Sequence, residues 1–71
     1  MKKTFETELY GTVEVRPAMF DIDGTNLEEG IEIKGEEIGI IELYGWRDIE
    51  DLITTEVEDL IFNTDKLRYG I

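Results

Sequence analysis

The chain has 71 residues, of which 41% are hydrophobic, and it contains no cysteine and no histidine. Disulfides and thiolate metal sites are therefore excluded, and the commonest general base is absent. The apolar fraction and the three Phe, three Tyr and one Trp argue against a disordered acidic tail. No apolar run approaches the roughly 20 residues of a membrane span, and no signal-peptide core follows Lys2 and Lys3. We expect one folded domain over residues 1–71 and a cytoplasmic location.

Charge is the most unusual property of the sequence. The formal net charge is −11, and residues 21–59 contain fourteen acidic residues against Lys34 and Arg47, which makes −12 for this segment alone. The two ends together contain four acidic and five basic residues, so they are almost neutral. Repulsion of this size destabilises a small compact state. It argues against nucleic acid or an anionic membrane as a partner, and it favours a basic one.

The first predicted element is a strand over residues 4–16, where apolar and polar side chains alternate. Gly11 lies within it, so either one strand bends there or a three-residue hairpin loop holds Gly11 in the left-handed conformation. We favour the bent strand, because the hairpin would place Leu9 in the loop. Pro17 cannot donate a ladder hydrogen bond and is expected to end the strand. The side chains expected to face the core are Phe5, Thr7, Leu9, Val13 and Val15.

More strands are expected before the helix. Residues 18–22 predict a short one, which is closed by the turn-forming run Asp23-Gly24-Thr25-Asn26. Residues 30–34, with Ile31 and Ile33 inward, and residues 37–44 predict a hairpin that turns around Gly35. The run Ile38-Gly39-Ile40-Ile41 breaks the alternation, which indicates a central strand or a bulge near Gly39.

Residues 48–62 are predicted to form an amphipathic helix. Asp48 is the expected N-cap, with Asp51 three residues later in the manner of a capping box. No Lys or Arg occurs in this stretch, so its polar face is purely anionic, although exposed helices usually mix charges. Residues 66–71 are expected to add a short edge strand. The apolar stripe consists of Ile49, Leu52, Ile53, Val57, Leu60 and Ile61, and the anionic side of Asp48, Asp51, Glu58 and Asp59, flanked by Glu50 and Glu56.

These elements predict an α+β fold, a three- to five-stranded, mostly antiparallel sheet with one acidic amphipathic helix packed on one face. Tyr44 and Trp46 lie in the connection between the last strand and the helix. They are either the edge of the core beneath the helix or aromatic anchors of a binding surface.

Residues 20–27, FDIDGTNL, resemble the first motif of haloacid-dehalogenase-type phosphatases. By this resemblance Asp21 would be the nucleophile and Asp23 the general acid and base. The later Ser/Thr, Lys and acidic pair of that family are missing, and no helix follows the motif. We interpret these residues as a turn, and we predict that the chain is not an enzyme.

The same segment also matches a calcium-binding loop in part. Asp21, Asp23 and Glu32 stand at its first, third and twelfth positions, with Thr25 at the fifth. Asn26 takes the sixth position, where the sharp turn requires glycine. A Ca²⁺- or Mg²⁺-binding loop over Asp21–Glu32 is the weaker alternative function, and otherwise we expect no cofactor.

On a continuous helix, six carboxylates from Asp48 to Asp59 would span about 16 Å, or about one charge per 2.7 Å, within a factor of about two of duplex DNA. In size, charge and compactness the chain resembles small acidic inhibitors of phages and mobile elements that mimic nucleic acid, including many anti-CRISPR proteins. This resemblance implies a non-enzymatic monomer or homodimer that occupies the nucleic-acid-binding groove of a basic partner. The alternative is a protein–protein interaction module or partner subunit with an acidic, solubilising surface. The residues expected to bind the partner are Glu28, Glu29, Glu36, Glu37, Asp48, Asp51, Glu58, Asp59, Tyr44 and Trp46.

Overall fold

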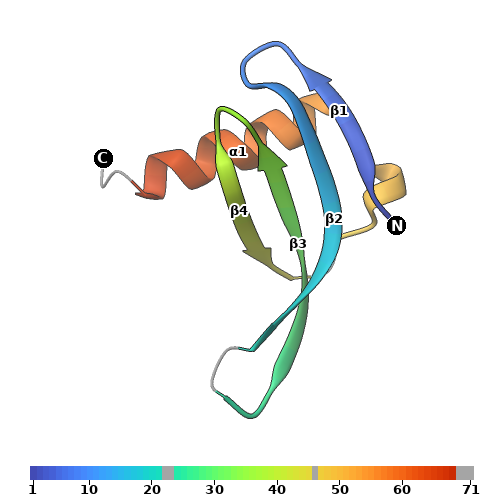
Figure 1. The fold of residues 1–71 in the computed structure, drawn as a ribbon, viewed down its shortest axis with the longest axis vertical. Helices are drawn as coiled ribbons and strands as arrows, with labels where there is room; N and C mark the ends of the chain where they lie inside the picture. The colour runs from blue at the N-terminus through green and yellow to red at the C-terminus, as the bar shows by residue number, and fades with distance from the viewer. Residues whose placement is uncertain (22–23, 46, 69–71) are drawn as a thin grey trace.

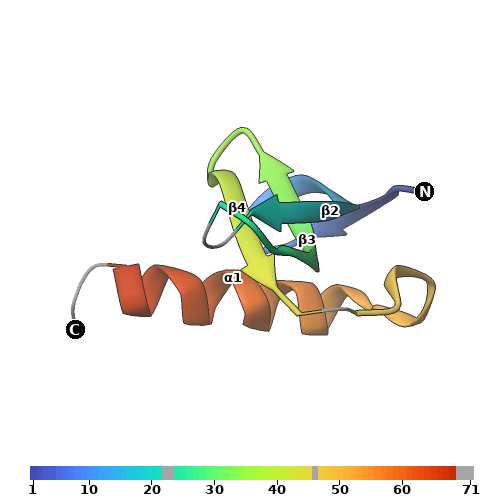
Figure 2. The same cartoon turned by 90° about the horizontal axis from the view of Figure 1, so that it is seen from below.

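The predicted fold class is confirmed by a computed structural model, which describes residues 1–21, 24–45 and 47–68, the last four by their backbone only. Four strands form one antiparallel sheet in the order β1-β2-β3-β4, and a C-terminal helix packs against one of its faces (Figure 1). Viewed along the sheet, the helix forms a separate layer (Figure 2). The elements in chain order are β1 (Lys3–Thr7), β2 (Gly11–Asp21), β3 (Leu27–Gly35), β4 (Gly39–Tyr44), the short 3₁₀ helix η1 (Ile49–Asp51) and α1 (Thr54–Arg68).

The first two strands form a hairpin, so the bent strand that we favoured is wrong. Residues 8–10 make the turn, and Gly11 closes it with φ = 71°, the left-handed value that a three-residue loop requires at this point. The Thr7 hydroxyl stabilises the turn, because it donates to the Gly11 carbonyl at 2.7 Å and accepts the Tyr10 N–H at 2.9 Å. Leu9 does lie in the loop and is 66% exposed, while Tyr10 packs against the core.

The second hairpin, between β3 and β4, is built in the same way. Residues 36–38 make its turn, and Gly39, with φ = 69°, pairs with Gly35 across it. The predicted hairpin is therefore confirmed, with its turn slightly later in the chain than expected. The break in alternation around Gly39 marks the end of this turn. Because β4 is the last strand of the sheet, it is an edge strand and not a central one.

β2 and β3 are longer than their neighbours and project beyond them as a two-stranded arm, residues 17–21 and 27–29 (Figure 1). β2 runs through Pro17 without interruption, so the predicted strand end at Pro17 is wrong, and the short strand expected after it is the end of β2. β1 pairs with β2 only as far as Val15. Pro17 therefore lies where one edge of β2 is open, and a proline is tolerated there.

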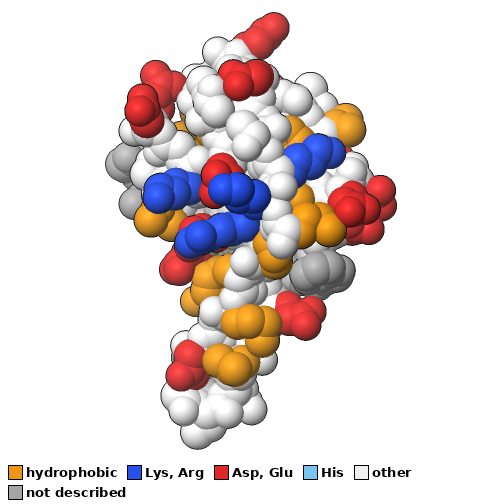
Figure 3. Space-filling view, turned by 45° about the vertical axis from the view of Figure 1, so that its right-hand side comes forward, with side chains coloured by type: hydrophobic (Ala, Val, Ile, Leu, Met, Phe, Trp, Pro, Cys, Tyr) orange, Lys and Arg blue, Asp and Glu red, His pale blue; other side chains and the backbone are white. Residues whose placement is uncertain are grey.

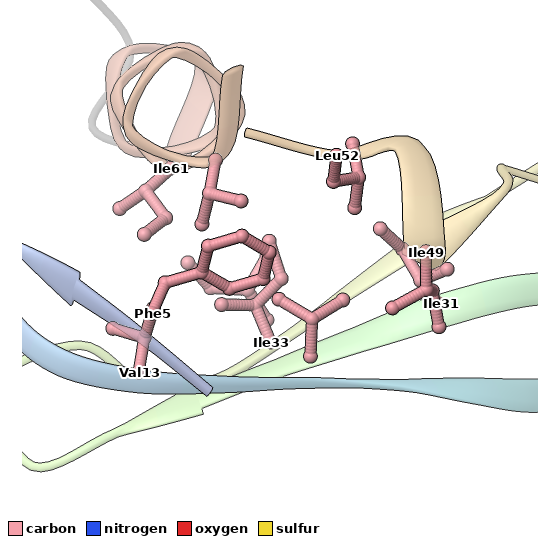
Figure 4. Packing of buried hydrophobic residues seen from close by; sticks show 10 residues of the cluster. Phe5, Val13, Ile31, Ile33, Ile49, Leu52 and Ile61 are labelled. Carbon is pink, nitrogen blue, oxygen red and sulfur yellow. The ribbon is translucent and has the colours of Figure 1, made fainter. Parts of the chain in front are cut away.

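The core lies between the sheet and the C-terminal segment, with side chains from both layers pointing toward each other (Figure 4). The inward positions predicted from the alternation are confirmed for Val13, Val15, Ile31 and Ile33, which are almost completely buried. Burial of a side chain of this kind contributes about 1.5–3 kcal/mol. The cluster consists of Phe5, Val13, Val15, Ile31, Ile33, Ile41, Ile49, Leu52, Val57 and Ile61.

The predicted single helix is divided into two. Asp48 caps η1, where its carboxylate accepts the Glu50 N–H at 3.1 Å, and the chain is then extended at Leu52. This break changes the phase of the apolar stripe. Leu52 remains buried, but Ile53 is 58% exposed, so the predicted core position of Ile53 is wrong. The Ile53 N–H donates to the Glu56 carboxylate at 3.1 Å, which makes this pair one half of a capping box at the start of α1.

α1 then continues further than predicted. It runs to Arg68, so residues 66–68 belong to the helix and not to an edge strand, while residues 69–71 lie outside the described residues. Leu60 is half-buried against the core. Within the described part of the chain, no helix has the length and apolar character needed to cross a membrane.

Candidate functional site

The residues predicted to bind a partner lie on several separate parts of the surface. Glu28 and Glu36 are eight residues apart on β3 and its turn, which corresponds to about 26 Å along a strand. Glu28 and Glu36, at the two ends of β3, therefore cannot belong to one compact patch. Trp46 lies outside the described residues. The remaining residues lie in the arm (Glu29), in the β3–β4 turn (Glu37), at the end of β4 (Tyr44), at η1 (Asp48 and Asp51) and on α1 (Glu58 and Asp59).

The compact part of the predicted surface is residues 48–59, which we call the acidic segment. None of its exposed carboxylates forms an ion pair with a cation of the described residues. Two of them, on Asp48 and Glu56, accept backbone N–H groups next to them and so cap η1 and α1. Carboxylates near the start of a helix are also stabilised by its dipole. The exposed acidic residues of the segment are Asp48, Glu50, Asp51, Glu56 and Asp59.

Lys3 attaches the acidic segment to the sheet. Its ammonium group donates to the carbonyl oxygens of Glu50 and Leu52, both at 3.2 Å, and lies 5.2 Å from the centre of the Phe5 ring. The contact is made with backbone oxygens, so no carboxylate of the segment is paired by it. Ile49 and Leu52 are buried on the core side of the same stretch. The acidic segment therefore has a defined position relative to the sheet.

Glu58 has a structural contact that the sequence did not reveal. Its carboxylate oxygen Oε2 accepts the N–H groups of Glu8 at 2.9 Å and Leu9 at 3.3 Å, so it joins α1 to the β1–β2 turn. The helical spacing placed Glu58 on the free anionic side, together with Asp59. In the structure Glu58 is half-buried whereas Asp59 is exposed. The signal that was missed is the turn itself, because the N–H groups of a hairpin loop need acceptors.

The outer face of the sheet, which faces away from α1, has a different distribution of charge. Arg16 donates to Glu32 from two nitrogens, at 2.7 and 2.8 Å, and Lys2 lies 3.5 Å from Glu14. Lys34 lies opposite Glu14 in the register of β2 and β3. Figure 3 shows Lys and Arg side chains gathered in the middle of the molecule, with acidic side chains among and around them. The outer face is therefore mixed in sign, and the acidic segment has one sign.

Tyr44 lies on this outer face and not beneath the helix, so the first of its two interpretations, the edge of the core under the helix, is wrong. Its ring is tilted against that of Phe20, with 5.0 Å between the ring centroids, and Tyr44 remains 56% exposed. Phe20 is buried against Gly30, where a Cβ would come within 2.6 Å of the Phe20 ring and would clash with the Leu43 carbonyl oxygen. Only glycine fits at position 30 without a shift of the backbone.

The described residues of the segment that resembles a phosphatase motif lie at the tip of the arm. The Asp21 carboxylate accepts the Gly24 N–H at 2.7 Å, and Gly24 has φ = 85°. A side-chain acceptor followed by a left-handed glycine is typical of turns. Ile22 and Asp23, the residues between them, lie outside the described residues.

The structure does not bring the ends of the proposed calcium loop together. Glu32 pairs with Arg16, which is five residues from Asp21 along β2, or about 16 Å. Glu32 is also the acceptor of the Arg16 ion pair. In the described ranges, no three or more Asp and Glu side chains are grouped so that they could hold a metal ion.

An open depression of about 770 Å³ lies beside the two hairpin turns. Its walls combine Lys34 with Glu14, Glu36 and Glu37, and they include the flat backbone of Gly11. This mixture of charges resembles the rest of the outer face. The depression therefore gives no sign of selecting a ligand of one charge.

Comparisons with protein-family models, with curated proteins and with the solved structures found no match to this chain. Its fold and surface define it as a small α+β protein with a four-stranded antiparallel sheet and a single-sign acidic segment on the helix side.

Proposed function

We propose that this chain is a non-enzymatic, cytoplasmic binding protein that occupies the nucleic-acid-binding groove of a basic partner protein. It would act in the manner of the small acidic inhibitors of phages and mobile elements, such as anti-CRISPR proteins. The observation that supports this proposal is the acidic segment, whose five exposed carboxylates have no ion-pair partner among the described cations. A groove built for phosphates attracts such a surface, because complementary potentials favour association and raise its rate.

The way in which the segment is held also supports the proposal. The caps at Asp48 and Glu56, the Lys3 contacts and the buried Ile49 and Leu52 hold the backbone of the acidic segment against the core. A surface ordered before binding loses less conformational entropy on association than a disordered acidic tail. The chain therefore presents its carboxylates in a prepared arrangement, as a folded nucleic acid presents its phosphates.

The arrangement differs from the regular spacing expected on one helix. Three of the exposed carboxylates, on Asp48, Glu50 and Asp51, lie at η1, while Glu56 and Asp59 follow on α1 after the extended link. The negative charge is therefore densest at η1. We infer that η1 is the centre of the contact and that α1 extends it.

The experiment compares two double charge reversals with the same change in net charge. Asp51→Lys with Asp59→Lys alters the acidic segment, and Glu6→Lys with Glu42→Lys alters exposed residues of the outer face. Each immobilised variant is exposed to a lysate of the host cell, and retained proteins are eluted with salt or with a short nucleic-acid duplex. Circular dichroism verifies that all variants are folded.

We expect the unaltered chain and the outer-face variant to retain a basic nucleic-acid-binding protein, which the duplex displaces. Retention should weaken steeply from about 0.05 to about 0.5 M salt, because the Debye length falls well below about 10 Å in this range. The acidic-segment variant should not retain the protein. A partner whose binding is insensitive to salt and to both reversals would show that the acidic segment only maintains solubility.

The arm supports a second candidate function, that of an interaction module or partner subunit. It projects beyond α1 and exposes Met19 and Leu27, while an isolated two-stranded ribbon has little stability of its own. If a partner covers the arm, Met19→Ser with Leu27→Ser should abolish its retention in the same assay, whereas the reversal in the acidic segment should not.

A further inference from the structure

The sheet has open edges at β1, at β4 and along both strands of the arm, and they differ in how well they are protected against pairing with another strand. The open part of β3 carries Glu28 and Glu29. The edge at β1 carries Lys3 and Glu6, and the open part of β2 contains Pro17. Charged residues, especially lysine, and proline are the usual means of preventing such pairing. β4 has only one charged residue, Glu42, and no proline. The edge at β4 is therefore the one suited to accept a further strand.

The backbone groups of this edge are directed outward at known positions. The Gly45 N–H donates to the Glu29 carbonyl at 3.0 Å, so odd-numbered residues of this part of the chain face β3. In an antiparallel ladder the backbone N–H and C=O groups of successive residues point alternately toward one neighbouring strand and toward the other side. The N–H and C=O groups that face the open side therefore belong to Ile40, Glu42 and Tyr44, and the side chains of Ile40 and Tyr44 are 54% and 56% exposed.

α1 extends past this edge. Figures 1 and 2 both show its C-terminal half continuing beyond β4, where the sheet has no strand to cover it. In the view of Figure 1 the helix crosses behind the part of β4 nearer Gly39. The inward side chain near the other end of β4, Leu43, is only half-buried, whereas Ile41 is buried. The helix and the strand edge together leave room for additional structure at this side.

We propose that β4 pairs antiparallel with β4 of a second copy of this chain, which joins the two sheets into one of eight strands. Antiparallel pairing of identical edges obeys two-fold symmetry, so each copy satisfies the same groups of the other. Because α1 crosses β4 away from its middle, the two helices pass side by side. Each projecting helix half then lies beneath the other sheet and covers Leu43 of the other copy.

Charge along α1 fits this arrangement. Glu56, Glu58 and Asp59 occupy its first two turns, whereas its last turn contains Asp65 together with Lys66 and Arg68, which leaves a net positive charge there. Two helices that lie antiparallel bring the acidic beginning of one beside the basic end of the other. On β4, a register that places Glu42 opposite Ile40 of the second copy keeps the two Glu42 carboxylates from facing each other directly.

The net charge of −11 on each copy opposes this association, so salt should strengthen it. Binding to a basic partner has the opposite dependence on salt. A failure to dimerise therefore does not contradict the proposed function, and a failure to bind a basic partner does not contradict the dimer.

The test uses Glu42→Pro, which removes an outward N–H without removing a hydrogen bond to β3. Thr4→Pro makes the same change at the outer edge of β1, and Glu42→Gln removes the charge alone. Sedimentation equilibrium in about 0.5 M salt, from about 10 µM to about 1 mM chain, should show a dimer for the unaltered protein and for both controls. Glu42→Pro should weaken dimerisation by about tenfold or more, because two symmetric hydrogen bonds are lost.

A monomer throughout this range for the unaltered chain would overturn the proposal, as would equal dimerisation of folded Glu42→Pro and Thr4→Pro. If Glu42→Pro does not fold, amide hydrogen exchange of the unaltered chain decides the matter. The N–H groups of Ile40 and Glu42 should become protected as concentration rises, while that of Thr4 should not. Exchange at Glu42 that is independent of concentration in a dimeric sample would place the interface elsewhere and overturn the proposal.

Discussion

The outer face of the sheet and the acidic segment use charged residues in opposite ways. On the outer face, Arg16 and Glu32 are joined by a two-nitrogen contact, and Lys2 lies beside Glu14. In the acidic segment the carboxylates cap backbone groups or project into solvent, and no described cation is paired with them. The chain therefore contains cations and has the geometry to pair them. The single sign of the acidic segment is a local property of this surface and is separate from the excess of acid in the composition.

The largest effect should come from the core beneath the acidic segment. Ile61→Ala removes a completely buried side chain and should lower the free energy of unfolding by about 2–5 kcal/mol, enough to unfold much of so small a domain. Ile53→Ala, in the exposed link, should change it by less than about 0.5 kcal/mol. Urea denaturation followed by circular dichroism measures both. Equal losses at the two positions would mean that the link is buried and that the acidic segment is oriented differently.

A smaller but clear loss is expected on the outer face at Gly30. Gly30→Ala places a Cβ against the Phe20 ring and the Leu43 carbonyl, so the backbone must shift at a cost of about 1–3 kcal/mol. Gly24→Ala cannot serve as the control, because an alanine is strained at the positive φ of Gly24. The control is Ala18→Gly, which exchanges the same two residue types at the position of β2 opposite Gly30. A variant Gly30→Ala with unchanged stability would indicate that Phe20 packs elsewhere and that the ring pair with Tyr44 is absent.

Glu58 and Asp59 are neighbours in the acidic segment, but their substitution should affect stability differently. Glu58→Ala removes the acceptor of two turn N–H groups and should cost about 1 kcal/mol, since these groups are exposed and water replaces part of the loss. Asp59→Ala should stay within about 0.5 kcal/mol. For partner binding the order of the two effects should reverse, so that Asp59→Ala weakens retention more than Glu58→Ala does. Thermal unfolding together with the retention assay measures both properties in the same pair of variants.

The smallest effect is expected for the ion pair of the outer face. Arg16→Met with Glu32→Gln should change stability by no more than about 1 kcal/mol, because Arg16 stays open to solvent and removing both charges together leaves neither of them unpaired. Partner retention should be unchanged, since the pair lies on the face opposite the acidic segment. Loss of retention in this folded variant would transfer the binding surface to the outer face and remove the contrast between the two regions.

Patterns of neighbouring residues were sufficient for the fold class and for most of the core. The alternation in β2 and β3 placed Val13, Val15, Ile31 and Ile33 correctly, because side chains of a strand must alternate between two faces. The helical spacing likewise placed Val57 and Ile61. The acidic composition of residues 48–59 was also evident, although which of these carboxylates are free was not.

The tertiary structure decided the features that depend on what lies beside a residue. Gly11 permits either a bend or a turn, and the Thr7 hydroxyl and the Glu58 carboxylate favour the turn, although it places Leu9 in solvent. Pro17 fits within β2 because β1 has already ended.

The same distinction separates the acidic residues. By sequence Glu58 and Asp59 are equivalent members of one anionic face, and only the packing of α1 on β1 and its turn distinguishes them. The sequence by itself thus determined the sign and amount of charge, since composition and local periodicity carry that information. Which carboxylates remain available to a partner was decided by contacts about 50 residues apart in the chain, and no local pattern encodes such contacts.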